Sequence, residues 1–420
     1  MYFYLGIDFG TSGARAVVIN DEASISAEVQ YPFEASPTSG TATAWQTALF
    51  SLIEQIPVEL RKHLRAIAID GTSSTVLLCD AAGNPVDAPI FYNDARSASV
   101  IESLRAIAPP NHTVLSATSS LAKLLWMTEL PTFTSARYFL HQADWLAFLL
   151  HGKAGISEYH NALKLGYDVE QLGYPVWLTE LPIMELLPVV LVPGTPVGAV
   201  TAEIAERFDL RRDCLVCAGT TDSIAAFLAS GAQLPGVAVT SLGSTLVLKL
   251  LSRTRVEDAR YGIYSHRLGN LWLTGGASNT GGAVLRQLFT DAQIEQLSSQ
   301  IDTSKESCLD YYPLLKPGDR FPVNDPTLPP QLEPRPADPV EFLHGLLESI
   351  ARIEVRGYHM LQNLGATPIT HVYTAGGGAV NRSWATIRAR HLRVPLVPPV
   401  HTAAAYGTAL LAMRGVQDVL

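Results

Sequence analysis

A run of apolar residues that ends in a glycine-rich turn and then resumes constrains the fold of this chain more than any other feature. The first apolar run ends at Asp8, and the turn Gly10-Thr11-Ser12-Gly13 separates it from a second run at residues 16–19. Short apolar runs bounded by Gly and Ser are typical of β-strands. The pattern therefore predicts two strands joined by a tight turn.

The same order of strand, turn and strand returns in the second half of the sequence. An apolar run at residues 237–240 leads into Ser241-Leu242-Gly243-Ser244-Thr245, and residues 246–250 resume the run. We interpret the two copies as a weak internal duplication with its boundary at residues 215–232. Strands that alternate with helical patterns are typical of α/β proteins.

Helices and one irregular segment fill the space between these turns. The helix with the clearest ends spans residues 338–365, where Asp338 can cap the start and Gly365 can close the end. Residues 100–190 are mostly helical in pattern. Prolines cluster at residues 313–339, which predicts a long irregular excursion that serves as a lid or as a tie between domains.

Composition excludes several classes of protein. Apolar residues make up 47% of the chain and charged residues 16%, which is unlike an intrinsically disordered chain. A net charge of −9 argues against sequence-wide binding to nucleic acid or to an anionic membrane. No apolar stretch approaches the roughly 18–20 residues of a membrane span, and the N-terminus lacks the basic region of a secretory signal. With four cysteines, we expect a reduced, cytoplasmic protein.

Five glycine-rich turns follow apolar strands and are candidate phosphate sites. Any one of them alone is best explained as an ordinary tight turn. Their repetition suggests phosphate binding, because glycine lets backbone N–H groups approach a phosphate and Ser or Thr hydroxyls can donate to its oxygens. Neither a Walker A nor a Rossmann signature occurs. The turns lie at residues 10–13, 71–75, 243–245, 275–282 and 376–378.

Two aspartates at the ends of apolar segments are candidate functional residues. Asp8 lies just before the first turn, where it could hold Mg²⁺ beside phosphates through water or accept hydrogen bonds from the N–H groups of the turn. Asp222 follows Gly219-Thr220-Thr221 and precedes an apolar helix, so a helix N-cap is its structural alternative. For the isolated pair Cys214 and Cys217, we expect no redox or metal role.

Several collinear segments resemble motifs of the FGGY carbohydrate kinases, which belong to the actin-like, ribonuclease H-like ATPase superfamily. Residues 6–15 resemble the first phosphate motif, residues 241–245 the second, and residues 374–382 the adenosine motif. The resemblance extends in order over nearly the whole chain. Further similar segments are residues 120–126 with Lys123 and Trp126, residues 144–168, and residues 313–322.

The resemblance implies an α/β fold with two ribonuclease H-like (actin-like ATPase) domains and a cleft between them. It implies an N-terminal sugar-binding domain of residues 1–230 with 402–420, and a C-terminal nucleotide-binding domain of residues 231–401. The implied activity is that of an ATP-dependent sugar kinase, an ATP:sugar phosphotransferase that transfers the γ-phosphoryl group to a sugar hydroxyl. Such chemistry depends mostly on positioning and charge stabilisation.

The resemblance also implies roles for individual residues. Asp222 would be the general base, and Asp8 would organise Mg²⁺. The sugar would lie near Ser73, Ser74, Asp94 and Asp222. The residues expected to bind ATP are Thr11, Ser12, Gly13, Gly243, Ser244, Thr245, Gly376, Gly377 and Asn381.

The turn at Gly71-Thr72-Ser73-Ser74-Thr75 bears on the choice of sugar. Xylulose kinases typically have Gln-Met-His at this place, and the turn is more similar to that of ribulose- and ribitol-type members. We therefore expect a pentulose, D-ribulose before D-xylulose. The open alternatives are D-xylulose or another polyol, and a non-catalytic or slowly hydrolysing nucleotide-gated binding protein on the same fold. We expect sugar and ATP as the only partners, without nucleic acid or membrane, and a monomer or a homodimer.

Overall fold

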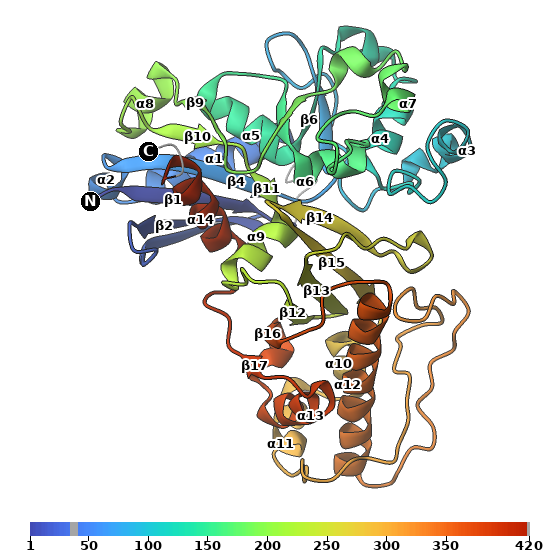
Figure 1. Cartoon of the computed structure of the whole chain (residues 1–420). Coiled ribbons are helices and arrows are strands. Elements are labelled where there is room, and N and C mark those ends of the chain that lie inside the picture. Colours follow the sequence, from blue (N-terminus) through green and yellow to red (C-terminus); the bar gives the residue numbers. More distant parts are fainter. Residues whose placement is uncertain (34–40, 418–420) are drawn as a thin grey trace. The chain divides into compact units, whose positions relative to one another are not determined.

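The computed structural model describes residues 1–33 and 41–417, and the chain forms two compact units (Figure 1). Unit 1 comprises Met1–Ala229 together with Ala403–Leu420, and unit 2 comprises Ser230–Thr402. Residues 418–420, the end of the predicted N-terminal domain, lie outside the described residues. No helix in the described part of the chain is long and apolar enough to cross a membrane.

A mixed sheet of seven strands forms the centre of unit 1. Its order is β3-β2-β1-β4-β10-β9, and β11 also pairs with β4. The predicted first two strands are β1 and β2, which pair antiparallel, whereas β1 and β4 are parallel. The strands are β1 (Phe3–Phe9), β2 (Gly13–Asn20), β3 (Ile25–Pro32), β4 (Leu64–Gly71), β9 (Pro196–Ala199), β10 (Leu215–Cys217) and β11 (Thr220–Thr221).

Helices cover both faces of this sheet. On one face, apolar side chains of α1 (Ala42–Gln55), α5 (Gln142–His151) and α8 (Ala202–Phe208) share a buried core with the strands. On the other face, α14 (Ala404–Gln417) packs on β1 and β4, with the end of α9 (Asp222–Ala229) beside it. This two-sided burial explains why β1 and β4 are apolar along nearly their whole length.

The predicted mostly helical region at residues 100–190 also contains short strands. Tyr138-Phe139-Leu140-His141 forms β6, which pairs with β5 more than fifty residues earlier. A four-residue apolar run fits a strand or a helix equally well by periodicity, so the sequence pattern missed it. The further elements of unit 1 are α2 (Val58–Arg61), β5 (Val76–Cys79), α3 (Ile101–Arg105), α4 (Ser120–Met127), β6 (Tyr138–His141), β7 (Ile156–Glu158), α6 (Tyr159–Ala162), α7 (Val176–Thr179) and β8 (Val189–Leu191).

Unit 2 repeats the core arrangement of unit 1. Its sheet has the order β14-β15-β13-β12-β16-β17. Strands β12 and β13 form an antiparallel pair around the second turn, and β12 is parallel to β16, as β1 is to β4. The predicted duplication is therefore visible in the strand pairing. The strands are β12 (Val237–Leu242), β13 (Leu246–Ser252), β14 (Tyr264–Leu268), β15 (Leu271–Ser278), β16 (His371–Ala375) and β17 (Leu396–Val397).

The longest helix of unit 2 has the predicted ends. It is α12 (Pro339–Asn363); the Asp338 carboxylate accepts a hydrogen bond from the N–H of Val340 at 2.9 Å, and Gly365 beyond its end has φ +103°. Its apolar stripe, which includes Leu346 and Ile350, is fully buried. The other helices of unit 2 are α10 (Gly282–Leu288), α11 (Asp291–Ser298) and α13 (Arg382–Leu392).

The proline-rich segment at residues 313–338 has no helix or strand and packs on unit 2. Leu314 and Phe321 lie in the core of this unit, and the Phe321 ring lies against Gly276 and Gly357, where a Cβ would collide with it. Burial of these side chains fixes the segment to α12 and the sheet. The role of the segment as a lid or as a tie between domains stays a prediction.

Candidate functional site

The first glycine-rich turn lies between β1 and β2 at one end of the unit 1 sheet. The N–H of Gly10 donates to the carbonyl of Gly13 at 3.1 Å, and Thr11 and Ser12 are exposed at the tip. A Cβ on Gly13 would lie 2.7 Å from the carbonyl oxygen of Tyr31, so this glycine also permits the close approach of β3. The hydroxyls of Thr11 and Ser12 are thus accessible to a ligand.

Three aspartates gather beside this turn. Asp8 on β1 lies opposite Asp70 on β4 in the parallel register. Asp222 begins α9 directly after β11, whose Thr220 pairs with Asp70. The three carboxylates therefore lie at the carboxyl ends of neighbouring parallel strands, the usual place for ligand sites in α/β sheets.

Asp70 directly precedes the turn at residues 71–75 and was not among the candidate residues of the sequence analysis. It is fully buried, its Oδ2 accepts a hydrogen bond from the Thr408 hydroxyl of α14, and its Oδ1 has no hydrogen-bond partner among the described residues. Burial, followed by the charges of Asp8 and Asp222, raises the pKa of Asp70 well above its ordinary value. Asp70 is therefore a buried carboxyl group that lies close to the charges of two other carboxylates.

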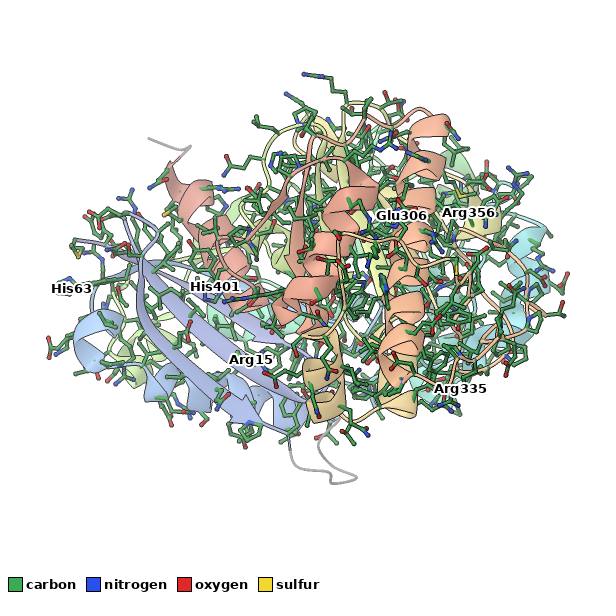
Figure 2. The ribbon with its side chains drawn as sticks, turned by 90° about the horizontal axis from the view of Figure 1, so that it is seen from below. Arg15, His63, Glu306, Arg335, Arg356 and His401 are labelled. Carbon is green, nitrogen blue, oxygen red and sulfur yellow. The ribbon has the colours of Figure 1, made fainter. Side chains whose placement is uncertain are left out.

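Asp8 has a similar but less extreme environment. Burial raises the pKa of Asp8, while the adjacent Asp70 carboxyl group and the charge of Arg15 oppose the shift. Arg15 lies opposite Asp8 on β2, and Figure 2 labels it on the sheet of unit 1. A cation placed between the two carboxylates would relieve their repulsion.

These residues fit a magnesium ion that also binds phosphate. In the described residues, 1–33 and 41–417, no group of three or more His, Cys, Asp or Glu side chains could hold a metal ion by itself. Mg²⁺ in phosphoryl-transfer sites normally has one or two protein carboxylates, several waters and the phosphates of the substrate. Asp8 and the unpartnered Oδ1 of Asp70 match this requirement.

The Asp222 carboxylate accepts a hydrogen bond from the N–H of Ser223 at 2.6 Å. Asp222 is half-buried at the first turn of α9. The bond to Ser223 is local to the helix start, which agrees with the structural alternative of a cap. The half-exposed position beside Asp70 equally leaves the carboxylate accessible to a substrate hydroxyl.

A small cavity of about 220 Å³ adjoins the first turn in unit 1. Thr72 and Gln142 lie on its wall, and Gln142 Oε1 accepts from both the N–H and the hydroxyl of Thr72, at 3.1 and 3.2 Å. The lining combines aromatic rings with amide and hydroxyl groups, which suits a small polyol. The lining residues are Gly10, Thr11, Phe33, Trp45, Thr72, Phe91, Tyr92, Asn93 and Gln142.

The predicted sugar-binding serines do not line this cavity. Ser73 is half-buried, and Ser74 is buried with φ +64° and an Oγ that has no hydrogen-bond partner among the described residues. Asp94 is held by Arg96, which donates to it from Nε and from an Nη at 2.9 and 2.6 Å and lowers its pKa. Thr72 and Asn93, adjacent in sequence to these residues, line the cavity instead.

Two predicted nucleotide motifs lie side by side in unit 2. The carbonyls of Gly243 and Ser244 accept hydrogen bonds from the N–H groups of residues 282 and 283 at 2.9 and 3.1 Å, which ties the second turn to the start of α10. Gly376 has φ +83°, and a Cβ on it would lie 2.7 Å from the Leu242 carbonyl oxygen. Glycine at 376 therefore lets the end of β16 approach the turn after β12.

A larger cavity of about 700 Å³ opens beside the adenosine motif. Of the predicted ATP residues, Gly377 and Asn381 line it. Asn381 caps α13 by accepting from the N–H of Trp384 at 2.9 Å, and its amide donates to Ser298 at 2.8 Å. The remaining lining residues are Gly282, Leu285, Arg286, Asp291, Ile294, Glu295, Ser298, Ser299, Gly378, Val380, Arg382, Ser383 and Trp384.

Comparisons with known proteins agree with this arrangement. The family models for the N-terminal and C-terminal domains of the FGGY family of carbohydrate kinases match residues 3–229 and 238–416. The chain is 23% identical to a xylulose kinase of Staphylococcus xylosus over 99% of this chain and 92% of that protein, and 22% identical to one of Bacillus subtilis over 99% and 88%.

Solved structures have the same fold. The crystal structure of xylulose kinase from Rhodospirillum rubrum superposes with a TM-score of 0.85 at 22% identity, covering 100% of this chain and 91% of that one. A Plasmodium falciparum glycerol kinase with ADP superposes with a TM-score of 0.81 at 16% identity, covering 100% and 90%. The predicted α/β fold of the actin-like ATPase type is confirmed. With both family domains matched in order, the chain belongs to the FGGY family of carbohydrate kinases and is a sugar phosphotransferase.

Proposed function

We propose that this protein transfers the γ-phosphoryl group of ATP to a hydroxyl group of a pentulose. The observation that carries the proposal is the cluster of Asp8, Asp70 and Asp222 beside an exposed Thr-Ser turn and a small polar cavity in unit 1. The larger cavity of unit 2, lined by Gly377 and Asn381, supports adenosine binding there.

Each residue has one task in this proposal. Asp222 accepts the proton of the attacking sugar hydroxyl. An ionised carboxylate can take this proton, and the hydroxyl is a weak nucleophile until the proton has left. Asp8 and Asp70 would hold Mg²⁺, which supplies positive charge to the phosphates when bound. Hydroxyl and N–H groups of the turns orient the phosphates. These turns contribute Thr11, Ser12 and Gly13 from unit 1, and Gly243, Ser244, Thr245 and Gly376 from unit 2.

The choice of pentulose rests on two observations. The relatives that span nearly the whole chain are named xylulose kinases, so D-xylulose is the first sugar to test. The small residues of the turn Gly71–Thr75 favour D-ribulose, which we keep as the second candidate. Ser73 and Ser74 would act by shaping the turn, and Thr72 and Gln142 by donating to and accepting from the sugar.

The test is an assay of ADP release with a panel of sugars. We expect either pentulose to raise ATP turnover far above glycerol, because a site built to bond several hydroxyls rejects analogues that lack them, by up to about 10⁴-fold. Equal rates with glycerol and with both pentuloses would contradict the assignment. Slow ATP hydrolysis that no sugar stimulates would favour a nucleotide-gated binding protein instead.

A further inference from the structure

A fully buried lysine without a carboxylate partner among the described residues lies in unit 1. Lys123 on α4 is 0% exposed. Its ammonium donates to the backbone carbonyls of Ser74 at 2.7 Å and Phe91 at 2.6 Å, and it forms no ion pair within the described residues. A buried ammonium costs stability unless it is well bonded, so its position calls for an explanation.

One of the two carbonyls belongs to a residue that lines the small cavity, and the other belongs to the turn beside it. Ser74 follows Thr72, which lines the cavity, by two residues, and Phe91 lines it directly. The N–H of Tyr92, another lining residue, donates to the Thr75 hydroxyl at 3.0 Å. The turn at 72–75 and the segment at 91–93 are therefore joined at two points, of which the Lys123 ammonium is one.

The backbone of the turn is strained at the point where Lys123 holds it. Ser74 has φ +64°, a conformation that is uncommon for residues other than glycine and that persists only where surrounding contacts impose it. A charge-assisted hydrogen bond to the Ser74 carbonyl is such a contact, since bonds from charged donors are roughly twice as strong as neutral ones.

We propose that Lys123 is a positioning residue, which ties the turn at residues 72–75 to the segment at residues 91–93 and thereby sets the affinity of the small cavity for sugar. This inference rests on the proposed function, in which the sugar occupies that cavity. Lys123 itself does not line the cavity, so it acts through the backbone that it holds.

The protonation state of Lys123 gives this role a measurable signature. Burial lowers its pKa from 10.5 to about 7; Asp94 raises it, and Lys164 and Arg96 lower it further. Asp94 lies in the loop after the 91–93 segment, Arg96 begins the turn packed on α4, and Lys164 lies in the turn at residues 163–165. Loss of the proton leaves a neutral amine whose bonds to the two carbonyls are weaker.

As the pH rises, the affinity for sugar should fall, whereas the contribution of Lys123 to stability should increase. As the pH rises from about 6 to about 8.5, the KM for sugar should rise by about fivefold to tenfold, while the KM for ATP stays constant. The unfolded chain binds more protons at Lys123 than the folded protein between pH 7 and pH 10.5, so this residue's contribution to the free energy of unfolding increases over that range. A general loss of structure at high pH would instead lower both the affinity for sugar and the stability of the protein.

The experiment compares steady-state kinetics of the wild type and of three variants across this pH range. In Lys123→Met we expect a raised and pH-independent KM for sugar with little change in kcat, and in Lys123→Arg a KM that stays low at high pH. Lys164→Met leaves the cavity lining intact and removes a charge that lowers the Lys123 pKa, so it should shift the KM profile to higher pH. This variant keeps the test decisive if Lys123→Met fails to fold.

Two results would overturn the inference, provided that a sugar stimulates the wild type. One is a wild-type KM for sugar that does not change with pH, and the other is a Lys164→Met profile identical to the wild-type profile. If no sugar stimulates the wild type, the proposed function fails, and hydrogen exchange then tests the tie by itself. Amide exchange at residues 75 and 92 should be about tenfold faster in Lys123→Met than in the wild type. In the wild type, it should speed up by about tenfold between pH 6 and pH 8.5, after correction for the intrinsic rate. Unchanged protection would refute the tie as well.

Discussion

Replacing Arg388 by Met tests how unit 2 holds its two nucleotide motifs. Arg388 on α13 and Glu354 on α12 are each 1% exposed and form a two-point ion pair, at 2.6 and 2.7 Å. Arg388 also donates to the hydroxyl of Thr374 on β16 at 2.8 Å, and Thr240 on β12 donates to Glu354 at 2.5 Å. The pair therefore binds both strands that lead into the nucleotide turns.

The magnitude follows from the charge that the substitution leaves behind. Arg388→Met leaves the buried Glu354 carboxylate without its charged partner, and removal of one partner from a buried pair costs about 3–5 kcal/mol. Thr374 loses a donor at the same time. Arg260→Met is the matched control, since Arg260 and Asp258 form a similar two-point pair at 3.0 and 2.7 Å but the Arg260 side chain is 72% exposed. Exposed pairs contribute only about 0–1 kcal/mol.

Urea unfolding followed by hydrogen exchange of the β12 and β16 peptides measures the effect in unit 2 by itself. We expect a large loss of stability for Arg388→Met and almost none for Arg260→Met. Glu354→Leu added to Arg388→Met should recover part of the loss, because an apolar pair leaves no unpaired charge. The reasoning would be refuted if Arg388→Met were as stable as the Arg260→Met control. It would also be refuted if the double variant were no more stable than Arg388→Met alone.

Three further substitutions test the site and one buried acid. Asp222→Asn should lower phosphoryl transfer by about 10²- to 10⁴-fold in an ADP-release assay, with ATP binding intact. Asn caps helices well, so a variant that keeps more than a tenth of the wild-type rate would show that Asp222 has only a capping role. Asp8→Asn should weaken Mg²⁺-dependent turnover, with part of the loss recovered at high Mg²⁺, and a rate insensitive to Mg²⁺ would argue against a metal role. Burial raises the pKa of Glu158 from 4.5 to about 8, so its stabilising contribution is complete below pH 4.5 and is lost as the pH rises through 8. Urea unfolding between pH 5 and pH 8 should therefore show a smaller loss of stability in Glu158→Gln than in the wild type, and parallel curves would contradict the shift.

The parts of the fold that the sequence predicts well are those set by local contacts. Asp338 and Gly365 mark the ends of α12 because a cap and a left-handed residue act within one helical turn. The turn at Gly243 joins two strands that are neighbours in the chain. The burial of Phe321 could not be predicted in this way, since the residues that cover it, such as Gly276 and Gly357, lie tens of positions away.

The candidate site shows the same limit, because its residues meet only through the pairing of distant strands. Asp8 attracted notice because it ends the first apolar run, and Asp70 ends another apolar run in the same way. What makes Asp70 notable is its place opposite Asp8, which follows from the parallel pairing of β1 with β4. A carboxylate at the end of one parallel strand is thus a reason to examine the last residue of each strand beside it.

Side-chain direction is a second step that residue type alone does not determine. Thr72, Ser73 and Ser74 have nearly the same chemistry, yet only Thr72 lines the cavity. Ser74 has a φ of +64°, and its carbonyl accepts a hydrogen bond from Lys123 on a helix almost fifty residues later. The sequence marks this turn as a candidate for sugar binding, but its contact with the distant lysine does not follow from the type of residue in the turn.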